Sequence, residues 1–414
     1  MPACGIDFGT SNSTVAIAPG GTARLIPLEG AHLTLPSAVF WHDDDPPEFG
    51  RAAIESYVRG DPGRLMRGLK STLGSALIQE RTRVGNRAVS FRDIVARYFA
   101  ELRTRLDRVQ PATGSVILGR PVHFIDDNAE GDRAAQDTLQ GIAHAVGFRE
   151  VGFQYEPIAA ALQYETTITA EELVLIVDIG GGTSDFSVVR VSPERAKAPD
   201  RAADILANDG IRVGGTDFDR LLSLAAVMPH LGYLSTTGGG KGTMPRHYHL
   251  DLATWHRINF LYTQRTEADL KALEGMADHP ERLSRLRRVV AARAGHALAM
   301  TVEDAKIALS GTEATRLPLA PLTGGPNPMV TRETFETAIV PPVDRIAATI
   351  RNVLAEAGVT PTTLGTVFMT GGSSDLPVLR RLVAEVLPGV RIATGDMLGS
   401  VGTGLALEAE RRFG

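Results

Sequence analysis

The spacing of apolar and polar residues predicts strands that alternate with helices. Apolar, β-branched runs of strand length occupy 174–177 and 186–191, and a similar pair occupies 4–6 and 14–18. Further strands are predicted at 115–121 and 366–370, and helices at 91–106, 133–146 (followed by the segment 151–157), 376–387 and the last residues up to Phe413. Ser90, with Asp93 three residues later, predicts the start of the first of these helices. This alternation indicates an α/β chain.

Two strand–turn–strand segments share an unusual turn composition. The first hairpin (4–18) contains Asp7 and the turn 9–13, and the second hairpin (174–191) contains Asp178, the turn 180–183 and Asp185. Glycines in such turns allow backbone N–H groups to approach a bulky anion, most often phosphate. One copy alone leaves an ordinary glycine-rich hairpin equally open. Two copies favour a polyphosphate held between two lobes, with a metal ion between Asp7 and Asp178.

Composition limits the class of protein. The 414 residues suit two lobes, and 43% hydrophobic and 22% charged residues are typical of a globular protein. A net charge of −5 argues against nucleic acid and anionic membranes as partners. No apolar stretch could cross a bilayer, no signal peptide is visible, and the single cysteine, Cys4, excludes an internal disulfide. We therefore expect a cytoplasmic protein.

Lysine is rare in this chain, and two lysines fall inside motifs. Lysine occurs only at Lys70, Lys197, Lys241, Lys271 and Lys306. A retained lysine offers a compact ammonium that can contact phosphate or water. Helical spacing also places Lys306 on one face with Glu303 and Ser310, which indicates contact with something polar. A solvent-facing stripe would give the same pattern.

Two further segments could suggest chemistry that we do not expect. Residues 238–242 resemble a phosphate-binding loop, but that motif needs Ser or Thr after the lysine and a preceding strand, whereas Gly242 follows Lys241 and the region has the composition of a loop. We expect a flexible loop there. His247, His249 and His256 lie close in sequence, but no Cys or acidic residue completes a zinc-binding spacing.

Together these motifs resemble a known family. Residues 7–13, 180–185, 214–219, 303–310 and 371–373, with Lys70 and Glu156-Pro157, occur in the order found in the ATPase domain of the seventy-kilodalton heat-shock (Hsp70, DnaK-type) chaperones. The resemblance covers essentially the whole chain. It implies the α/β actin-like ATPase fold of the actin/sugar-kinase superfamily. Each of its two lobes would have a ribonuclease-H-like mixed sheet flanked by helices, with a nucleotide cleft between the lobes.

The resemblance also implies a domain organisation. Lobe I would cover 1–171, with a small subdomain at about 36–100, and lobe II would cover 172–414, with a small subdomain at about 218–325. The C-terminal helix would return to lobe I. No peptide-binding domain is expected, so the chain is similar to the stand-alone, truncated relatives of the family.

The ligands implied by the resemblance are ATP or ADP and Mg²⁺. Asp7 and Asp178 would orient the Mg²⁺ ion through water. The phosphates would be bound by Gly9, Thr10, Ser11 and Asn12 from one lobe and by Gly180, Gly181, Gly182 and Thr183 from the other. The residues implied for hydrolysis are Lys70, Glu156, Asp178, Thr183 and Asp185. Those implied for ribose and adenine are Gly214, Gly215, Glu303, Lys306, Ser310, Gly371, Gly372 and Asp396. Pro121 and Glu156-Pro157 match elements that relay nucleotide state.

The sequence departs from the family in two places. Asp375 stands where the family stacks an arginine on adenine, and a carboxylate cannot make that cation–π contact. We expect weaker ATP affinity or base selectivity as a result. The segment between Pro229 and Trp255 does not follow the family pattern, so no exchange factor is carried over.

The leading interpretation is a monomeric, ATP-binding, slowly ATP-hydrolysing chaperone-like protein whose lobe closure regulates an unknown protein partner or client. One alternative is a small-molecule (sugar) kinase, which needs a general-base aspartate, and Asp185 is the only candidate. Another is a non-catalytic nucleotide sensor or an actin-like filament protein. Lys70 and Glu156 favour hydrolysis, because that reaction needs positioning and charge stabilisation.

Overall fold

The computed structural model describes residues 2–43, 45–84, 87–125, 128–165, 167–198, 200–394 and 399–414. The chain forms two compact units. The first comprises Met1–Arg212, Ala348–Ser374 and Val383–Gly414, and the second comprises Val213–Ala347 and Asp375–Leu382. Among the described residues, no helix is both long and apolar enough to cross a bilayer.

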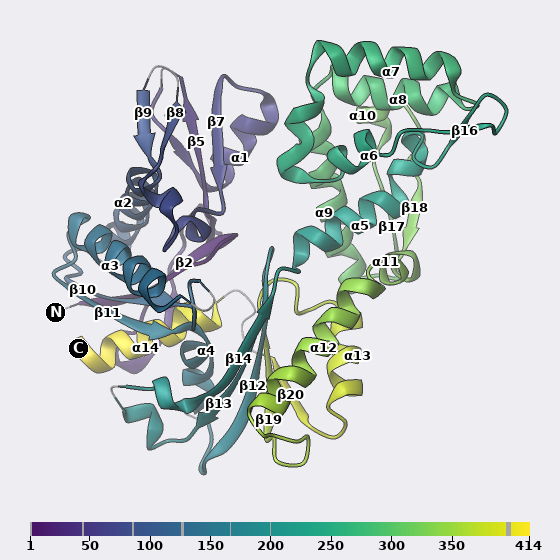
Figure 1. The fold of residues 1–414 in the computed structure, drawn as a ribbon. Helices are drawn as coiled ribbons and strands as arrows, with labels where there is room; N and C mark the ends of the chain where they lie inside the picture. The colour runs from purple at the N-terminus through teal and green to yellow at the C-terminus, as the bar shows by residue number, and fades with distance from the viewer. Residues whose placement is uncertain are drawn as a thin grey trace. The chain divides into compact units, whose positions relative to one another are not determined.

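The first unit contains two sheets with the same strand order (Figure 1). One runs β11 (Glu150–Tyr155), β10 (Ser115–Arg120), β1 (Ala3–Phe8), β2 (Asn12–Ile17), β3 (Arg24–Leu25), with β4 (Thr34–Pro36) also paired to β2. The other runs β20 (Arg391–Thr394), β19 (Thr366–Thr370), β12 (Glu172–Ile179), β13 (Ser184–Val191), β14 (Ile205–Ile211).

The two predicted hairpins occupy equivalent positions in these sheets. β1 is antiparallel to β2 and parallel to β10, while β12 is antiparallel to β13 and parallel to β19. The α/β prediction is therefore confirmed. The predicted lobe boundary at residues 171 and 172 stays a prediction; it would separate two sheets that both belong to the first unit.

Helices and short strands complete the first unit. The helices include α1 (Gly50–Arg59), η2 (Leu69–Thr72), α2 (Phe91–Val109), α3 (Ala129–Ala145), α4 (Glu156–Glu165) and α14 (Ser400–Phe413). The short strands are β5 (Ala38–His42), β6 (Glu48–Phe49), β7 (Gly63–Arg67), β8 (Arg81–Val84) and β9 (Arg87–Ser90). The predicted cap of α2 is confirmed, because the Asp93 N–H donates to Ser90 Oγ at 3.1 Å.

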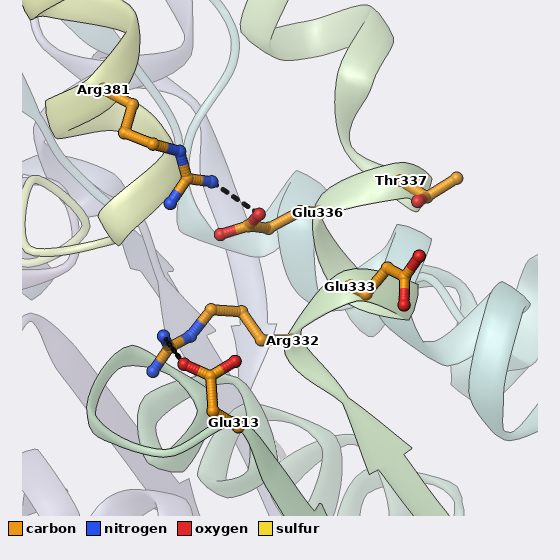
Figure 2. A pocket seen from close by; sticks show the side chains of 6 residues that line it. All are labelled: Glu313, Arg332, Glu333, Glu336, Thr337 and Arg381. Carbon is orange, nitrogen blue, oxygen red and sulfur yellow. Dashed lines mark hydrogen bonds and ion pairs between the residues drawn. The ribbon is translucent and has the colours of Figure 1, made fainter.

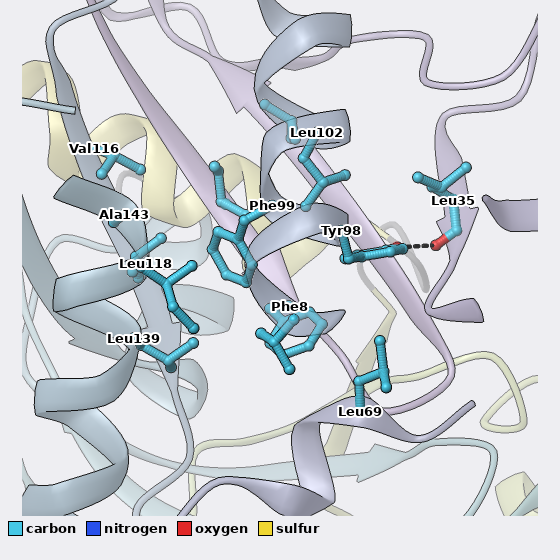
Figure 3. Packing of buried hydrophobic residues seen from close by; sticks show 14 of the residues in the cluster. Phe8, Leu35, Leu69, Tyr98, Phe99, Leu102, Val116, Leu118, Leu139 and Ala143 are labelled. Atoms are coloured by element: carbon cyan, nitrogen blue, oxygen red, sulfur yellow. Dashed lines mark hydrogen bonds between the residues drawn. The ribbon is translucent and has the colours of Figure 1, made fainter. Parts of the chain in front are cut away.

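One hydrophobic core lies directly behind two predicted site residues. Phe8 follows Asp7 and packs edge-on against Phe99, with ring centroids 5.1 Å apart (Figure 3). Leu69, which precedes Lys70, is buried in the same cluster. Burial of these neighbours restricts where Asp7 and Lys70 can lie.

The helices α4 and α14 cross at very short range. A Cβ added at Gly404 would overlap the backbone carbonyl of Ala159. Ile158 and Leu405, on these helices, are buried in a second core that includes Ile176 of β12. This packing holds α4, which begins at Glu156, against the rest of the first unit.

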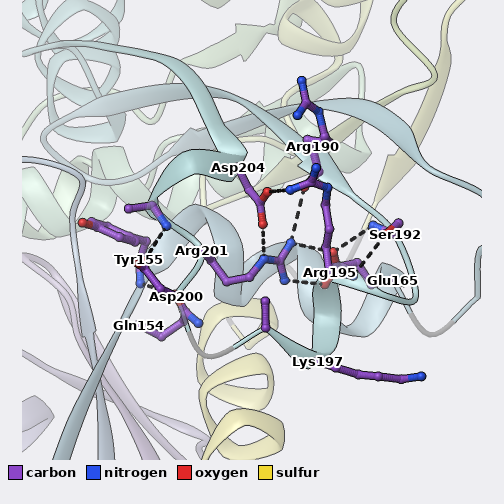
Figure 4. A network of polar contacts seen from close by, with 12 residues as sticks. Gln154, Tyr155, Glu165, Arg190, Ser192, Arg195, Lys197, Asp200, Arg201 and Asp204 are labelled. Atoms are coloured by element: carbon purple, nitrogen blue, oxygen red, sulfur yellow. Dashed lines mark hydrogen bonds and ion pairs between the residues drawn. The ribbon is translucent and has the colours of Figure 1, made fainter.

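The C-terminal end of α4 is anchored by buried charges (Figure 4). Arg201 donates from Nη2 to Glu165 Oε1 at 2.7 Å and from Nη1 to Glu165 Oε2 at 3.0 Å. The two side chains are 1% and 0% exposed. Arg201 also pairs with Asp204, which pairs in turn with Arg195. The connection between β13 and β14 is thereby tied to α4.

The second unit is mainly helical. Its helices include α5 (Gly215–Ala226), α6 (His247–Leu252), α7 (Gln264–Met276), α8 (Pro280–Ala291), α9 (Gly295–Gly311), α10 (Ala320–Thr323) and α11 (Arg332–Ala338). This unit also contains two short hairpins. One pairs β15 (Thr236–Thr237) with β16 (Gly242–Thr243), and the other pairs β17 (Ala314–Arg316) with β18 (Met329–Thr331). The helices α12 (Val340–Glu356) and α13 (Pro377–Val386) have residues in both units.

Candidate functional site

The turns of the two hairpins face each other within the first unit. A Cβ added at Gly181 would overlap the Ser11 hydroxyl. The first turn is braced by Ser37, whose N–H donates to Ser11 O at 2.8 Å and whose Oγ donates to Gly9 O at 2.6 Å. The structure therefore brings together the two turns that the sequence suggested as phosphate-binding.

The second turn is stabilised by its own hydrogen bonds and by the segment that follows β19. Gly180 N donates to Thr183 O at 2.9 Å, and Thr183 Oγ1 donates to Asp185 Oδ2 at 3.1 Å. Ser373 N donates to Ile179 O at 3.0 Å. Gly371 has a φ of +86°. A Cβ at this glycine would overlap Asp178 Oδ1, so only glycine fits beside that carboxylate.

Lys70 and Glu156 form an ion pair beside these turns. Lys70 Nζ lies 2.5 Å from Glu156 Oε1, and the two side chains are 13% and 17% exposed. Lys70 lies on η2 and Glu156 is the first residue of α4. Eighty-six positions separate them in sequence, so only the fold brings them together.

Several carboxylates crowd this lysine. Burial raises the pKa of Asp178 to about 8, with further contributions from Asp185 and Glu156. Burial and Glu156 likewise raise the pKa of Asp7 to about 7. Burial alone would lower the pKa of Lys70, but attraction to Glu156 and Asp7 raises it overall. Such mutual repulsion among acids favours a bound cation.

The predicted nucleoside-binding residues are divided between the units. Gly371 and Gly372 belong to the first unit, with all the residues predicted for the phosphates. Those in the second unit are Gly214, Gly215, Glu303, Lys306 and Ser310. Asp396 lies outside the described residues. The roles of all these residues stay predictions.

Lys306 does not belong to a solvent-facing stripe. It is 8% exposed, and its Nζ lies 2.8 Å from Asp219 Oδ1 and 3.4 Å from Gly215 O, at the start of α5. Glu303, three residues earlier on α9, is exposed, and Ser310 is half-buried. Contact with a polar group is thus confirmed for Lys306, and the group is part of the protein.

Asp375 is engaged by a neighbouring arginine. Arg380 Nη2 lies 2.5 Å from Asp375 Oδ1, and both side chains are nearly half exposed. A guanidinium is therefore present near this position, although it is not supplied by residue 375.

The expectation of a loop at 238–242 is wrong in part, because β15 precedes the glycines, residues 238–241 form the turn of the β15–β16 hairpin, and Gly242 begins β16. This turn holds a carboxylate of the protein. The N–H groups of Gly239 and Gly240 donate to Asp278 at 2.7 and 2.9 Å. Thr236 Oγ1 donates to the same side chain at 2.5 Å. Asp278 thus occupies the anion-binding geometry that suggested a phosphate-binding loop.

The histidines near 247–256 show no metal-binding arrangement. His249 is buried with its Nε2 3.0 Å from Leu231 O. In the part of the chain that the structure describes, no group of three His, Cys, Asp or Glu could hold a metal ion.

A cavity of about 400 Å³ lies in the second unit, lined by residues that the sequence analysis did not single out (Figure 2). Four of its five charged residues form two ion pairs, since Arg332 lies 2.5 Å from Glu313 and Arg381 lies 2.5 Å from Glu336. Arg332 Nε also donates to Leu309 O at 2.8 Å, at the end of α9. These contacts are explained by packing of α9, α11 and α13.

Two residues near the site were missed by the sequence analysis. Ser37 braces the first turn, and no sequence pattern marks it. Arg120 contacts the residue before Glu156, and a signal did exist for it: an arginine ends the otherwise apolar strand β10.

Two sheets of equal strand order, each with a glycine-containing turn at its centre, define a protein of the actin-like ATPase fold. A family model described as "Hsp70 protein" matches residues 81–228 and 277–400. The chain therefore belongs to the Hsp70 family.

Curated relatives agree with this assignment. The chain is 28% identical over 434 aligned residues to "Chaperone protein HscA" of Pectobacterium carotovorum, and 26% identical to that of Salmonella typhimurium. It is 27% identical to "Chaperone protein HscA homolog" of Azotobacter vinelandii. These alignments cover 99–100% of this chain and 58% of each relative, so the chain spans little more than half the relatives' length.

Proposed function

We propose that this chain binds ATP with Mg²⁺ and hydrolyses it slowly to ADP and phosphate, in the manner of an Hsp70-type chaperone. The Lys70–Glu156 ion pair carries the proposal, because it places an ammonium and a carboxylate beside Asp7, Asp178 and the two facing turns. Family membership supports nucleotide binding in general.

The residues present fit Mg²⁺. Asp7 and Asp178 are half-buried acids whose pKa values are raised by desolvation and neighbouring carboxylates, so a cation would favour their ionised forms. When bound, Mg²⁺ would neutralise charge on the phosphates. Since the described residues offer no three-residue chelate, the ion would take most of its ligands from phosphate and water, as Mg²⁺ commonly does.

The chain's own groups would do the remaining work. Backbone N–H groups of the two turns would bind phosphate oxygens, and Gly182 has open space in front of it because a Cβ there would meet nothing within 4 Å. Lys70 would hold a proton and stabilise negative charge on the γ-phosphoryl group. Glu156 would orient the attacking water by accepting its hydrogen bond.

The test is single-turnover hydrolysis by the native protein and by Lys70→Ala. We expect the variant to bind ATP but to hydrolyse it at least about 100-fold more slowly, the usual cost of losing a charge-stabilising group. Lys271→Ala, an exposed lysine on α7, is the control. Unchanged turnover in Lys70→Ala would refute the mechanism, and turnover stimulated by a small alcohol would favour a kinase.

The biological role is part of the same proposal. Nucleotide-dependent closure would regulate a protein partner or client in the cytoplasm, with the chain acting as a monomer. Membership of the Hsp70 family supports the nucleotide-binding part of this proposal. Light scattering that rises with protein concentration in ATP would contradict the monomer and indicate a filament.

A further inference from the structure

We propose that Arg120 is a positioning residue for Glu156. Arg120 ends β10 and pairs in register with Tyr155, the last residue of β11. Glu156 follows at once as the first residue of α4. The effect on hydrolysis rests on the proposed function, but the geometric effect does not.

The guanidinium of Arg120 covers the side chain next to Glu156. Its Cζ lies 5.1 Å from the centroid of the Tyr155 ring and 5.5 Å from that of Phe124. A planar cation over an aromatic face is attracted by the ring's quadrupole. Tyr155 is thereby held between its own strand and a charged group.

Arg120 is itself fixed from several directions. Its Nη1 donates to Gln136 Oε1 of α3 at 2.6 Å, and its Nη2 lies 3.5 Å from Asp132 Oδ2. Its Nε and Nη2 also donate to the carbonyls of Pro121 and Val122, at 3.2 and 3.3 Å. Only 15% of the side chain is exposed. An arginine so restrained acts as a rigid support for Tyr155.

Space around Glu156 is tight on the same side. Gly119 precedes Arg120, and a Cβ there would lie 3.3 Å from Glu156 Cγ. A displacement of β10 or β11 would therefore move the Glu156 carboxylate. Because Lys70 lies 2.5 Å from that carboxylate, the displacement would weaken its ion pair with Glu156.

The experiment uses the intact chain and labels its lysines with an amine-reactive reagent, read by mass spectrometry. In Arg120→Gln and in Tyr155→Leu, Lys70 should react about 2- to 30-fold faster, the range given by about 0.5–2 kcal/mol of lost contact. Tyr155→Phe keeps the ring face and should leave Lys70 reactivity unchanged. The matched control is Arg149→Gln, which alters an exposed arginine before β11.

Labelling of Lys306 distinguishes a local effect on Lys70 from a general loss of stability. Lys306 is also buried and ion-paired, but it lies in the second unit. Its reactivity should not change in these variants. Equal increases at Lys70 and Lys306, or no increase at either, would overturn the proposal.

Single-turnover kinetics gives the second measurement. Arg120→Gln should slow hydrolysis without changing the ATP dissociation constant, and should have no further effect in a Glu156→Gln background. Additive effects would overturn the positioning role. If the native protein hydrolyses no ATP, the proposed function fails, and lysine labelling still decides the role of Arg120.

Discussion

At the scale of single residues, the site depends on close approach between backbone and side chains. Gly371 lies against Asp178 and Gly181 lies against Ser11, and neither position has room for a Cβ. Gly182, next in sequence, has open space instead. Of two neighbouring glycines in one turn, only Gly181 is therefore restricted by a side chain packed against it.

This difference predicts unequal stability effects without nucleotide. Gly181→Ala should lower the free energy of unfolding by about 1–3 kcal/mol, because its methyl group would overlap the Ser11 hydroxyl. Adding Ser11→Ala should recover part of the loss. Gly182→Ala should change stability by about 0.5 kcal/mol or less. Equal urea midpoints for the two alanine variants would show that the turns do not face each other in solution.

At the scale of secondary-structure elements, α4 is held at both ends. Its first residue pairs with Lys70 and its last with Arg201. An acidic residue at a helix C-terminus opposes the helix dipole, so Glu165 needs this partner. The helix thus links the candidate site to the connection between β13 and β14.

Removing one partner of this buried pair should be costly. Arg201→Met leaves Glu165 buried without its cation, and we expect a loss of about 3–5 kcal/mol in urea denaturation. Arg195→Met is the matched control. The Arg195 side chain, which pairs with Asp204, is one-third exposed, so its loss should lower the free energy of unfolding by at most about 1 kcal/mol. Similar losses would mean that water reaches the network in solution.

The stability of the β15–β16 hairpin should fall at acidic pH. Hydrogen bonds from Thr236 and from the N–H groups of Gly239 and Gly240 lower the pKa of Asp278. The folded pKa is below the unfolded one, so this stabilisation is present above about pH 4 and is lost as pH falls through the folded pKa. Amide exchange protection of Gly239 and Gly240 should fall there. Asp278→Asn should remove the pH dependence, and its persistence would contradict the assignment.

At the scale of the whole molecule, the first unit is built from two copies of one sheet topology, and a single cysteine lies inside it. Cys4 is fully buried in β1, where the neighbouring Gly5 packs against the backbone of α14. Burial raises the pKa of its thiol, which further suppresses the thiolate. Its reactivity therefore reports opening of this unit.

We expect Cys4 to react with thiol reagents only through unfolding. Mg²⁺ and ATP at 100 times the dissociation constant should slow labelling about 100-fold if nucleotide binds the folded state alone. Cys4→Ser provides the blank. If labelling is fast and ATP does not slow it, either the unit opens without releasing nucleotide or the unit does not bind nucleotide.

Most local structure could be predicted from the sequence. The hairpins at β1–β2 and β12–β13, the cap at Ser90 and the final helix all follow from patterns within about twenty residues. Such patterns reflect backbone sterics and one-sided burial, which act locally.

The partner of each charged residue could not be predicted. Lys306 pairs with Asp219, Asp278 fills the glycine turn that suggested phosphate, and Arg120 covers Tyr155. These contacts depend on strand register and helix packing. Both bring together residues that are far apart in sequence.

The sequence alone determined the two glycine turns, their aspartates and the rare lysines, because each is a matter of residue type and local spacing. Only the tertiary structure decided that the turns face each other and that Lys70 meets Glu156. Parallel pairing of β10 with β11 fixes the end of β11, which Glu156 follows directly, and burial of Leu69 positions the neighbouring Lys70. Long-range packing, rather than local preference, therefore assembles the candidate site.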